Sequence, residues 1–121
     1  MMRDFFSLFR KPRLSVEAFD AYYHKLPDQI EVRWFRDSGM IIGEVTAGDK
    51  KFMTQGKDAS DFVEMVNDAV YTVYEIPRDY LGIIKESHSF SPKEHILKVL
   101  SDGKTLSGDM LVKKEKALQA I

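Results

Sequence analysis

The chain contains no cysteine. This absence excludes disulfide bonds, cysteine-based zinc sites and thiol catalysis, and it suits a reducing compartment. No apolar run approaches the roughly 18 residues that a membrane span needs. The apolar stretch near the N-terminus is only five residues long and follows Arg3 and Asp4, which is too short for a secretory signal. We therefore expect a cytoplasmic protein that has no membrane segment.

Histidine and glycine are also scarce, with 3 and 7 residues respectively. His24, His88 and His95 lack the i, i+4 spacing of a helical metal site, and we expect no bound metal. The glycines are scattered at turn sequences and form neither a dinucleotide-binding pattern nor a P-loop. These residues therefore predict no cofactor.

Carboxylates near the expected strands do not suggest catalysis. A nuclease of the RNase H type gathers several carboxylates around two metal ions. Asp37 and Asp49 lie in turn sequences, where aspartate commonly bonds to its own backbone. Glu31 and Glu44 occupy positions expected of solvent-facing strand residues. We therefore predict no catalytic residue and a protein that is not an enzyme.

The charge of the chain is unevenly distributed. Its 121 residues are 44% hydrophobic and 31% charged, which is typical of one soluble globular domain, and the net charge is only -1. Residues 1–13 carry a net +3, whereas residues 57–76 carry one lysine against five acids, a net -4. Such an acidic middle favours a basic protein partner over nucleic acid.

Hydrophobic periodicity predicts the elements of the first half. Apolar residues recur at three- and four-residue steps over residues 14–26, which predicts a helix that Pro27 ends. From Ile30 onward apolar and polar residues alternate, as in a half-buried strand. Two further strands are expected over residues 40–46 and 50–55, and turn sequences separate all three. Short turns between consecutive strands imply an antiparallel meander.

An amphipathic helix is expected over residues 58–76. Asp58 is a good N-cap, and an apolar stripe that includes Phe62, Val66 and Val70 marks the buried side. Pro77 limits its end.

The second half is harder to interpret. Residues 80–84 are expected to form a short strand, and Ser91 followed by Pro92 predicts the start of another helix. Residues 109–121 are predicted to be a last helix, with a hairpin across residues 95–113 as the alternative.

The order of strand, strand, strand and helix over residues 30–76 resembles the partial RNase H-like unit of HicB-type antitoxins. Phe52-Met53-Thr54-Gln55-Gly56-Lys57-Asp58 and the amphipathic helix that follows look like the strand exit and helix of that family. Gly39 falls at the family's glycine turn. The family's Asp-Leu-Pro-Gly segment is replaced here by Ala47-Gly48-Asp49-Lys50, and the C-terminal part shows no repressor module.

Together these observations predict an α+β domain with an antiparallel three- to four-stranded sheet and one helix packed across a face. A helical N-terminal extension is expected over residues 1–29, a HicB-like core over residues 30–90 and a helical C-terminal extension over residues 91–121. The resemblance implies a non-catalytic antitoxin that neutralises a small basic toxin ribonuclease.

Two surfaces are candidates for binding. The acidic residues of the 58–76 helix, Asp61, Glu64 and Asp68, are predicted to border the surface that binds a basic protein. The alternative is an RNA-binding strip beside an exposed aromatic residue, made of Arg33, Arg36, Lys50 and Lys51. Trp34 and Phe35 are adjacent in one strand and must face opposite ways, so at least one belongs to the core. The N-terminal aromatic residues Phe5, Phe6 and Phe9 with Leu8 are expected to pack on the domain or on a second subunit, as in a homo-oligomer.

Overall fold

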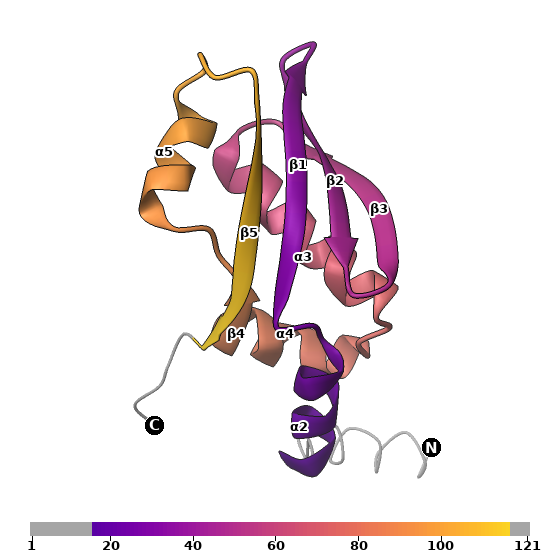
Figure 1. The fold of residues 1–121 in the computed structure, drawn as a ribbon. Helices are drawn as coiled ribbons and strands as arrows, with labels where there is room; N and C mark the ends of the chain where they lie inside the picture. Colours follow the sequence, from indigo (N-terminus) through magenta and orange to yellow (C-terminus); the bar gives the residue numbers. More distant parts are fainter. Residues whose placement is uncertain (1–15, 117–121) are drawn as a thin grey trace, which may run out of the picture.

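The computed structural model describes residues 16–116 and shows an α+β fold with a five-stranded antiparallel sheet (Figure 1). The elements are α2 (Val16–Lys25), β1 (Gln29–Asp37), β2 (Met40–Ala47), β3 (Lys50–Gly56), α3 (Ala59–Val73), α4 (Arg78–Ser87), β4 (His88–Phe90), α5 (Glu94–Ser101) and β5 (Ser107–Lys116). The strand order is β3-β2-β1-β5-β4. The expected α+β class and antiparallel sheet are confirmed, with five strands in place of three or four.

The first three strands form the predicted meander. Ser38 and Gly39 have φ values of 54° and 81°, as a two-residue turn of type I′ requires. Gly48 and Asp49 make the second two-residue turn, where Gly48 has a φ of 64°. Both turns therefore set the register of the strands that they join.

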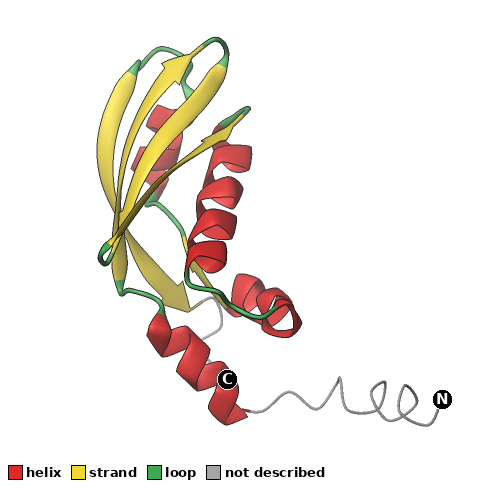
Figure 2. Cartoon of the chain, turned by 90° about the vertical axis from the view of Figure 1, so that its right-hand side faces the viewer, coloured by secondary structure: helices red, strands yellow, loops and turns green. Residues whose placement is uncertain are grey.

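Helices α3 and α5 lie on the same side of the curled sheet (Figure 2). The buried side chains of Phe62, Val66 and Val70 place α3 against the sheet. A Cβ atom at Gly43 would lie 2.6 Å from the ring of Phe62, and one at Gly56 would lie 2.4 Å from the Phe62 backbone. These two glycines therefore allow the beginning of α3 to approach β2 and β3 closely.

Helix α3 ends at Val73, before Pro77 is reached. The Asp61 N–H donates to the Asp58 carboxylate at 2.9 Å, which confirms Asp58 as the N-cap. At the other end, the Glu75 N–H donates to Thr72 O and the Ile76 N–H to Tyr71 O, both at 3.0 Å. This is a Schellman motif with Glu75 in the left-handed region, at a φ of 54°.

A buried asparagine holds β4 to α3. Asn67 Nδ2 donates to Phe90 O at 2.8 Å, and Asn67 Oδ1 accepts the Phe90 N–H at 2.7 Å. The same Nδ2 donates to Val63 O, and the Tyr71 hydroxyl donates to Oδ1 at 3.2 Å. Every polar atom of this side chain is therefore satisfied, as burial requires.

Helix α2 is fixed by a lysine from β5. Lys114 Nζ donates to Tyr23 O and Leu26 O, both at 3.0 Å, and lies 4.0 Å from the centre of the Tyr23 ring. Burial lowers the pKa of Lys114 below its ordinary value. Among residues 16–116, no helix is long and apolar enough to cross a membrane.

The structure differs from two predictions for the residues between α3 and β5. Residues 80–84, expected to be a strand, belong to α4, where Tyr80 and Ile84 are buried four residues apart on one helical side. The helix expected to start at Ser91 and Pro92 is present as α5, but it begins later, at Glu94, with Lys93 at its N-cap.

The expected helix over residues 109–121 is a strand as far as Lys116, and residues 117–121 lie outside the described part. The alternative hairpin across residues 95–113 is also excluded, because residues 94–101 form α5. The strand forms because Ile30 pairs with Val112, a partner that is distant in the sequence. Of the helical extension expected over residues 91–121, residues 94–101 are helical and residues 107–116 belong to the sheet.

Candidate functional site

Within the described residues, no helix covers the second face of the sheet (Figure 2). We call this surface the open face. Strand alternation and pairing arrange its side chains in cross-strand rows over β5, β1, β2 and β3. The first row is Leu111, Glu31, Thr46 and Lys51; the second is Asp109, Arg33, Glu44 and Met53; the third is Ser107, Phe35, Ile42 and Gln55.

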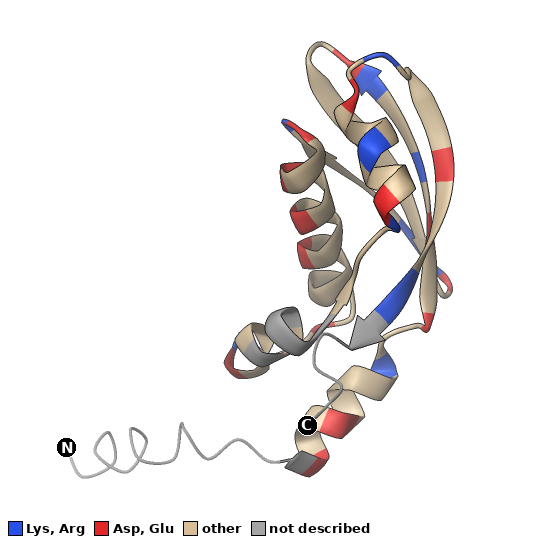
Figure 3. Ribbon diagram, turned by 90° about the vertical axis from the view of Figure 1, so that its left-hand side faces the viewer, with Lys and Arg blue, Asp and Glu red and all other residues tan. Residues whose placement is uncertain are grey.

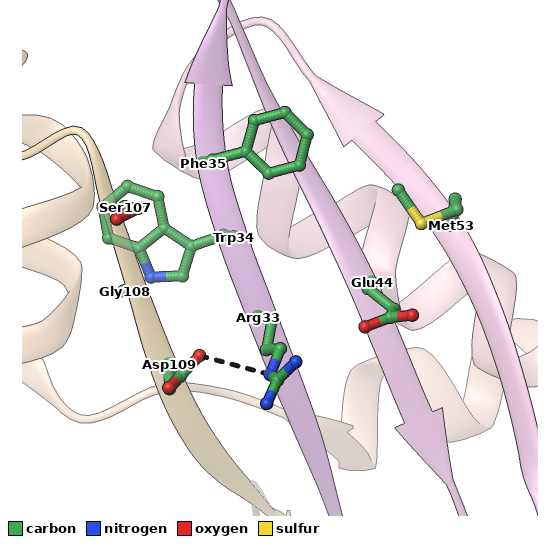
Figure 4. A pocket seen from close by; sticks show the side chains of 8 residues that line it. All are labelled: Arg33, Trp34, Phe35, Glu44, Met53, Ser107, Gly108 and Asp109. Carbon is green, nitrogen blue, oxygen red and sulfur yellow. Dashed lines mark ion pairs between the residues drawn. The ribbon is translucent and has the colours of Figure 1, made fainter.

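The open face exposes large apolar side chains. Phe35, Met53 and Leu111 are 41%, 57% and 61% exposed, and Ile42 is half-buried. A shallow hollow of about 480 Å³ lies among the second and third rows (Figure 4). Gly108 lies in its lining. A Cβ atom at this position would come within 3.0 Å of the indole of Trp34, the residue that pairs with Gly108 on β1. The hollow is open to solvent, so it is a surface depression and not an enclosed cavity.

Charges of both signs lie around the hollow. Arg33 Nε lies 3.8 Å from Asp109 Oδ1, with both side chains largely exposed, and Glu44 is the cross-strand neighbour on the other side of Arg33. An exposed ion pair of this kind contributes about 0–1 kcal/mol, which leaves its members able to pair with an incoming molecule. Among the described residues, no group of three or more possible ligands is placed to hold a metal ion.

The adjacent aromatic residues of β1 face opposite ways, as predicted. Trp34 is buried with its indole beside Gly108, whereas Phe35 is exposed on the open face (Figure 4).

The four residues of the predicted RNA-binding strip are divided between two faces. Arg33 and Lys51 lie on the open face, where acidic side chains are interleaved with them. Arg36 turns to the helix side, where it donates to Thr105 O at 2.6 Å and to Leu100 O at 2.7 Å. Lys50 Nζ lies 5.6 Å from the centre of the Tyr74 ring. The structure therefore does not bring the four together.

Arg36 links the end of α5 to the turn before β5, and its role is therefore structural. Its Nη2 also lies 3.5 Å from Asp102 Oδ1. Hydrogen bonds from Thr105 N–H, Lys104 N–H and the Thr105 hydroxyl hold the pKa of Asp102 below its ordinary value.

The acidic positions of α3 lie on the side of the helix that faces away from the sheet (Figure 3), and within Ala59–Val73 they are the predicted Asp61, Glu64 and Asp68. Asp61 accepts the Lys57 N–H at 2.8 Å, and Glu64 is exposed. Asp68 is half-buried and borders a second hollow of about 290 Å³, which Tyr71 and Leu81 also line. Since α3 covers one face of the sheet, these acids and the open face lie on opposite sides of the molecule.

Sequence reasoning missed the apolar residues of the open face. The signal was present, because Phe35, Ile42 and Met53 are large apolar residues at the strand positions that alternate with the inward-facing ones. Comparison with models of protein families, with curated proteins and with solved structures finds no match for the chain.

Proposed function

We propose that the chain is a non-catalytic protein-binding module that holds its partner on the open face. The observation that carries this proposal is the exposure of Phe35, Met53 and Leu111 on one rigid sheet surface. Aromatic residues and methionine are enriched in protein interfaces, and Phe35 and Met53 both line the hollow of this surface. The paired strands hold these side chains in place before binding, which limits the entropy that association costs.

The size of the open face fits a modest interface. Four strands about 4.8 Å apart and roughly eight residues long, at about 3.3 Å per residue, give roughly 500 Å². A standard interface buries about 800 Å² on each partner. The open face thus supplies most of one side of such an interface, and the partner is expected to reach over its rim.

The charges on the open face favour a basic partner. The carboxylates of Glu31, Glu44 and Asp109 lie near the centre of this surface and outnumber the two basic groups in its rows, Arg33 and Lys51. Following the resemblance to HicB-type antitoxins, we propose that this partner is a small basic ribonuclease, which the chain neutralises. The acids Asp61, Glu64 and Asp68 lie on the far side, where they add to a field that speeds encounter with such a partner.

The proposal is tested by sequencing the adjacent reading frames and measuring binding to any small basic protein that they encode. Phe35→Ser should weaken the Kd at least tenfold, as expected for a residue at the centre of an interface. Leu106→Ser is the matched control, because Leu106 is 70% exposed and lies in the turn before β5, outside the open face. This control should bind as the unchanged chain does.

Three results would contradict parts of the proposal. If Phe35→Ser binds normally while Glu64→Lys with Asp68→Lys weakens binding at every salt concentration, the interface lies on α3. Tight RNA binding that is lost on changing Arg33 and Lys51 would favour the nucleic-acid alternative. Cleavage of RNA or DNA with Mg²⁺ or Mn²⁺, abolished by Glu44→Gln, would show that the protein is an enzyme.

A further inference from the structure

Strand β3 is an edge strand of the sheet (Figure 1). The two-residue turn before it makes Ala47 and Lys50 a hydrogen-bonded pair, and every second residue of β3 then bonds to β2. The N–H and C=O groups of Lys51, Met53 and Gln55 consequently point away from the sheet. No backbone group within residues 16–116 pairs with them.

The usual protections of an edge strand are largely missing from β3. Proteins block such edges with proline, with bulges or with charged side chains that point inward. Strand β3 has no proline and its pairing with β2 is continuous. Of its inward side chains, Lys50 is charged, whereas Phe52 and Thr54 are not. Charge is confined to Lys50 and Lys51 at its beginning. The outward backbone groups are therefore open to another strand.

Exposed methionines lie on both sides of this edge. Met53 is on the open face, and Met65 is 38% exposed on α3. Met65 lies beside the edge strand, because the Thr54 hydroxyl is 3.5 Å from Met65 O, whereas Phe62 packs over Gly43 on β2. Ala69 and Thr72 follow Met65 at i+4 and i+7, which makes an uncharged stripe along that flank of α3.

We infer that two copies of this chain associate through the edges of β3. Antiparallel pairing about a two-fold axis at Met53 places Met53 of each copy opposite its equivalent, and Lys51 opposite Gln55. All outward N–H and C=O groups of these three residues are then bonded. The uncharged stripes of the two α3 helices lie next to each other over the same axis.

The charges of the edge suit a second copy of the chain. No like charges face each other in this register, and the two Lys51 side chains are four residues apart along the strands. At about 3.3 Å per residue that separation is roughly 13 Å, which exceeds the Debye length of about 8 Å at physiological salt. Pairing thus places Met53 of each copy opposite its equivalent, with no like charges opposite each other along the two β3 strands.

The dimer has a ten-stranded sheet with two open faces side by side. It therefore presents the two open faces on the same side of the joined sheet. This inference does not depend on the proposed function, because it rests on β3 and α3 and not on any partner of the open face.

Sedimentation of the full chain tests the dimer. The unchanged protein should be dimeric, and Met53→Lys and Met53→Glu should each weaken the dimer Kd at least tenfold, because each puts like charges opposite each other at the axis. An equimolar mixture of the two variants should recover the association at low salt. Leu106→Lys, which changes an equally apolar exposed residue away from β3, should dimerise normally.

Hydrogen exchange supplies an independent readout. The amides of Lys51, Met53 and Gln55 should exchange more slowly as protein concentration rises, while thermal melting confirms that every variant is folded. A chain that stays monomeric up to about 1 mM would overturn the inference. So would a Met53→Lys variant that dimerises normally, or a dimer whose edge amides exchange as they do in the monomer.

Discussion

Tyr71 shows how strongly the environment of one side chain can alter its chemistry. Tyr71 belongs to α3 and its ring is buried. Its hydroxyl donates to Asn67 Oδ1 at 3.2 Å. Burial raises the pKa of Tyr71 well above its ordinary value, and the negative charge of Asp68 adds to the shift. The folded protein therefore keeps this proton at a pH where the unfolded chain loses it.

This shift predicts a loss of stability in alkali. Above about pH 10 the unfolded state binds fewer protons than the folded state, so the unfolding free energy falls as pH rises. Tyr71→Phe removes that dependence but also one hydrogen bond, which costs about 1 kcal/mol at pH 7. Denaturant melts should show the variant less stable at pH 7, with the gap narrowing above pH 10. Equal pH slopes for both proteins would contradict the assignment.

The predicted basic strip shows what single residues did and did not reveal. Arg33 and Arg36 are three positions apart in one strand, which already places them on opposite faces. Lys50 and Lys51 are neighbours and divide in the same way. The division of the strip was therefore predictable. The hydrogen bonds of Arg36 to the end of α5 were not, because α5 is distant in the sequence.

Helices and strands were predicted well wherever local chemistry decides them. Residues 29–73 follow the expected order because two-residue turns and a capped amphipathic helix leave few alternatives. Helix α4 was missed because a short apolar run such as residues 80–84 fits a buried strand or a helix equally well. Strand β5 was missed because its lysine-rich sequence favours a helix, while its pairing with β1 overrides that preference.

The end of α3 can be improved at one position. Glu75 has a positive φ of 54° at the position after the helix where glycine is preferred. Glu75→Gly should raise the unfolding free energy by about 0.5–1 kcal/mol, because a side chain in this conformation is strained. Chemical denaturation checks this value.

The same substitution inside α3 provides the control. Glu64→Gly lies in the exposed middle of the helix, where it should cost about 1 kcal/mol. If both variants lose stability, the left-handed conformation of Glu75 is not the cause of strain.

At the scale of the whole molecule, the sheet depends on β5. Val112 is buried beneath the helices and pairs with Ile30, whereas the adjacent Leu111 lies on the open face. Val112→Asp should therefore unfold the domain, because a buried unpaired charge costs several kcal/mol against a total of about 5–15 kcal/mol.

Leu111→Asp should melt close to the unchanged protein. The pair of variants also distinguishes a strand from the helix that the sequence suggested, because adjacent positions face opposite ways only in a strand. Circular dichroism during heating measures both. Similar melting of the two variants would contradict the assigned register.

The pairing of β1 with β5 also determines when the protein can fold during its synthesis. Strand β1 is made early, but one of its two neighbours ends at Lys116, and the link between Ile30 and Val112 closes a long loop. Contacts so distant in sequence slow folding, since the loop must close before they form. A nascent chain that has reached only α5 holds the meander with unpaired edges on both sides, at β1 and at β3. Translation that stalls there should therefore yield an aggregation-prone fragment, whereas release of the last strand completes the domain.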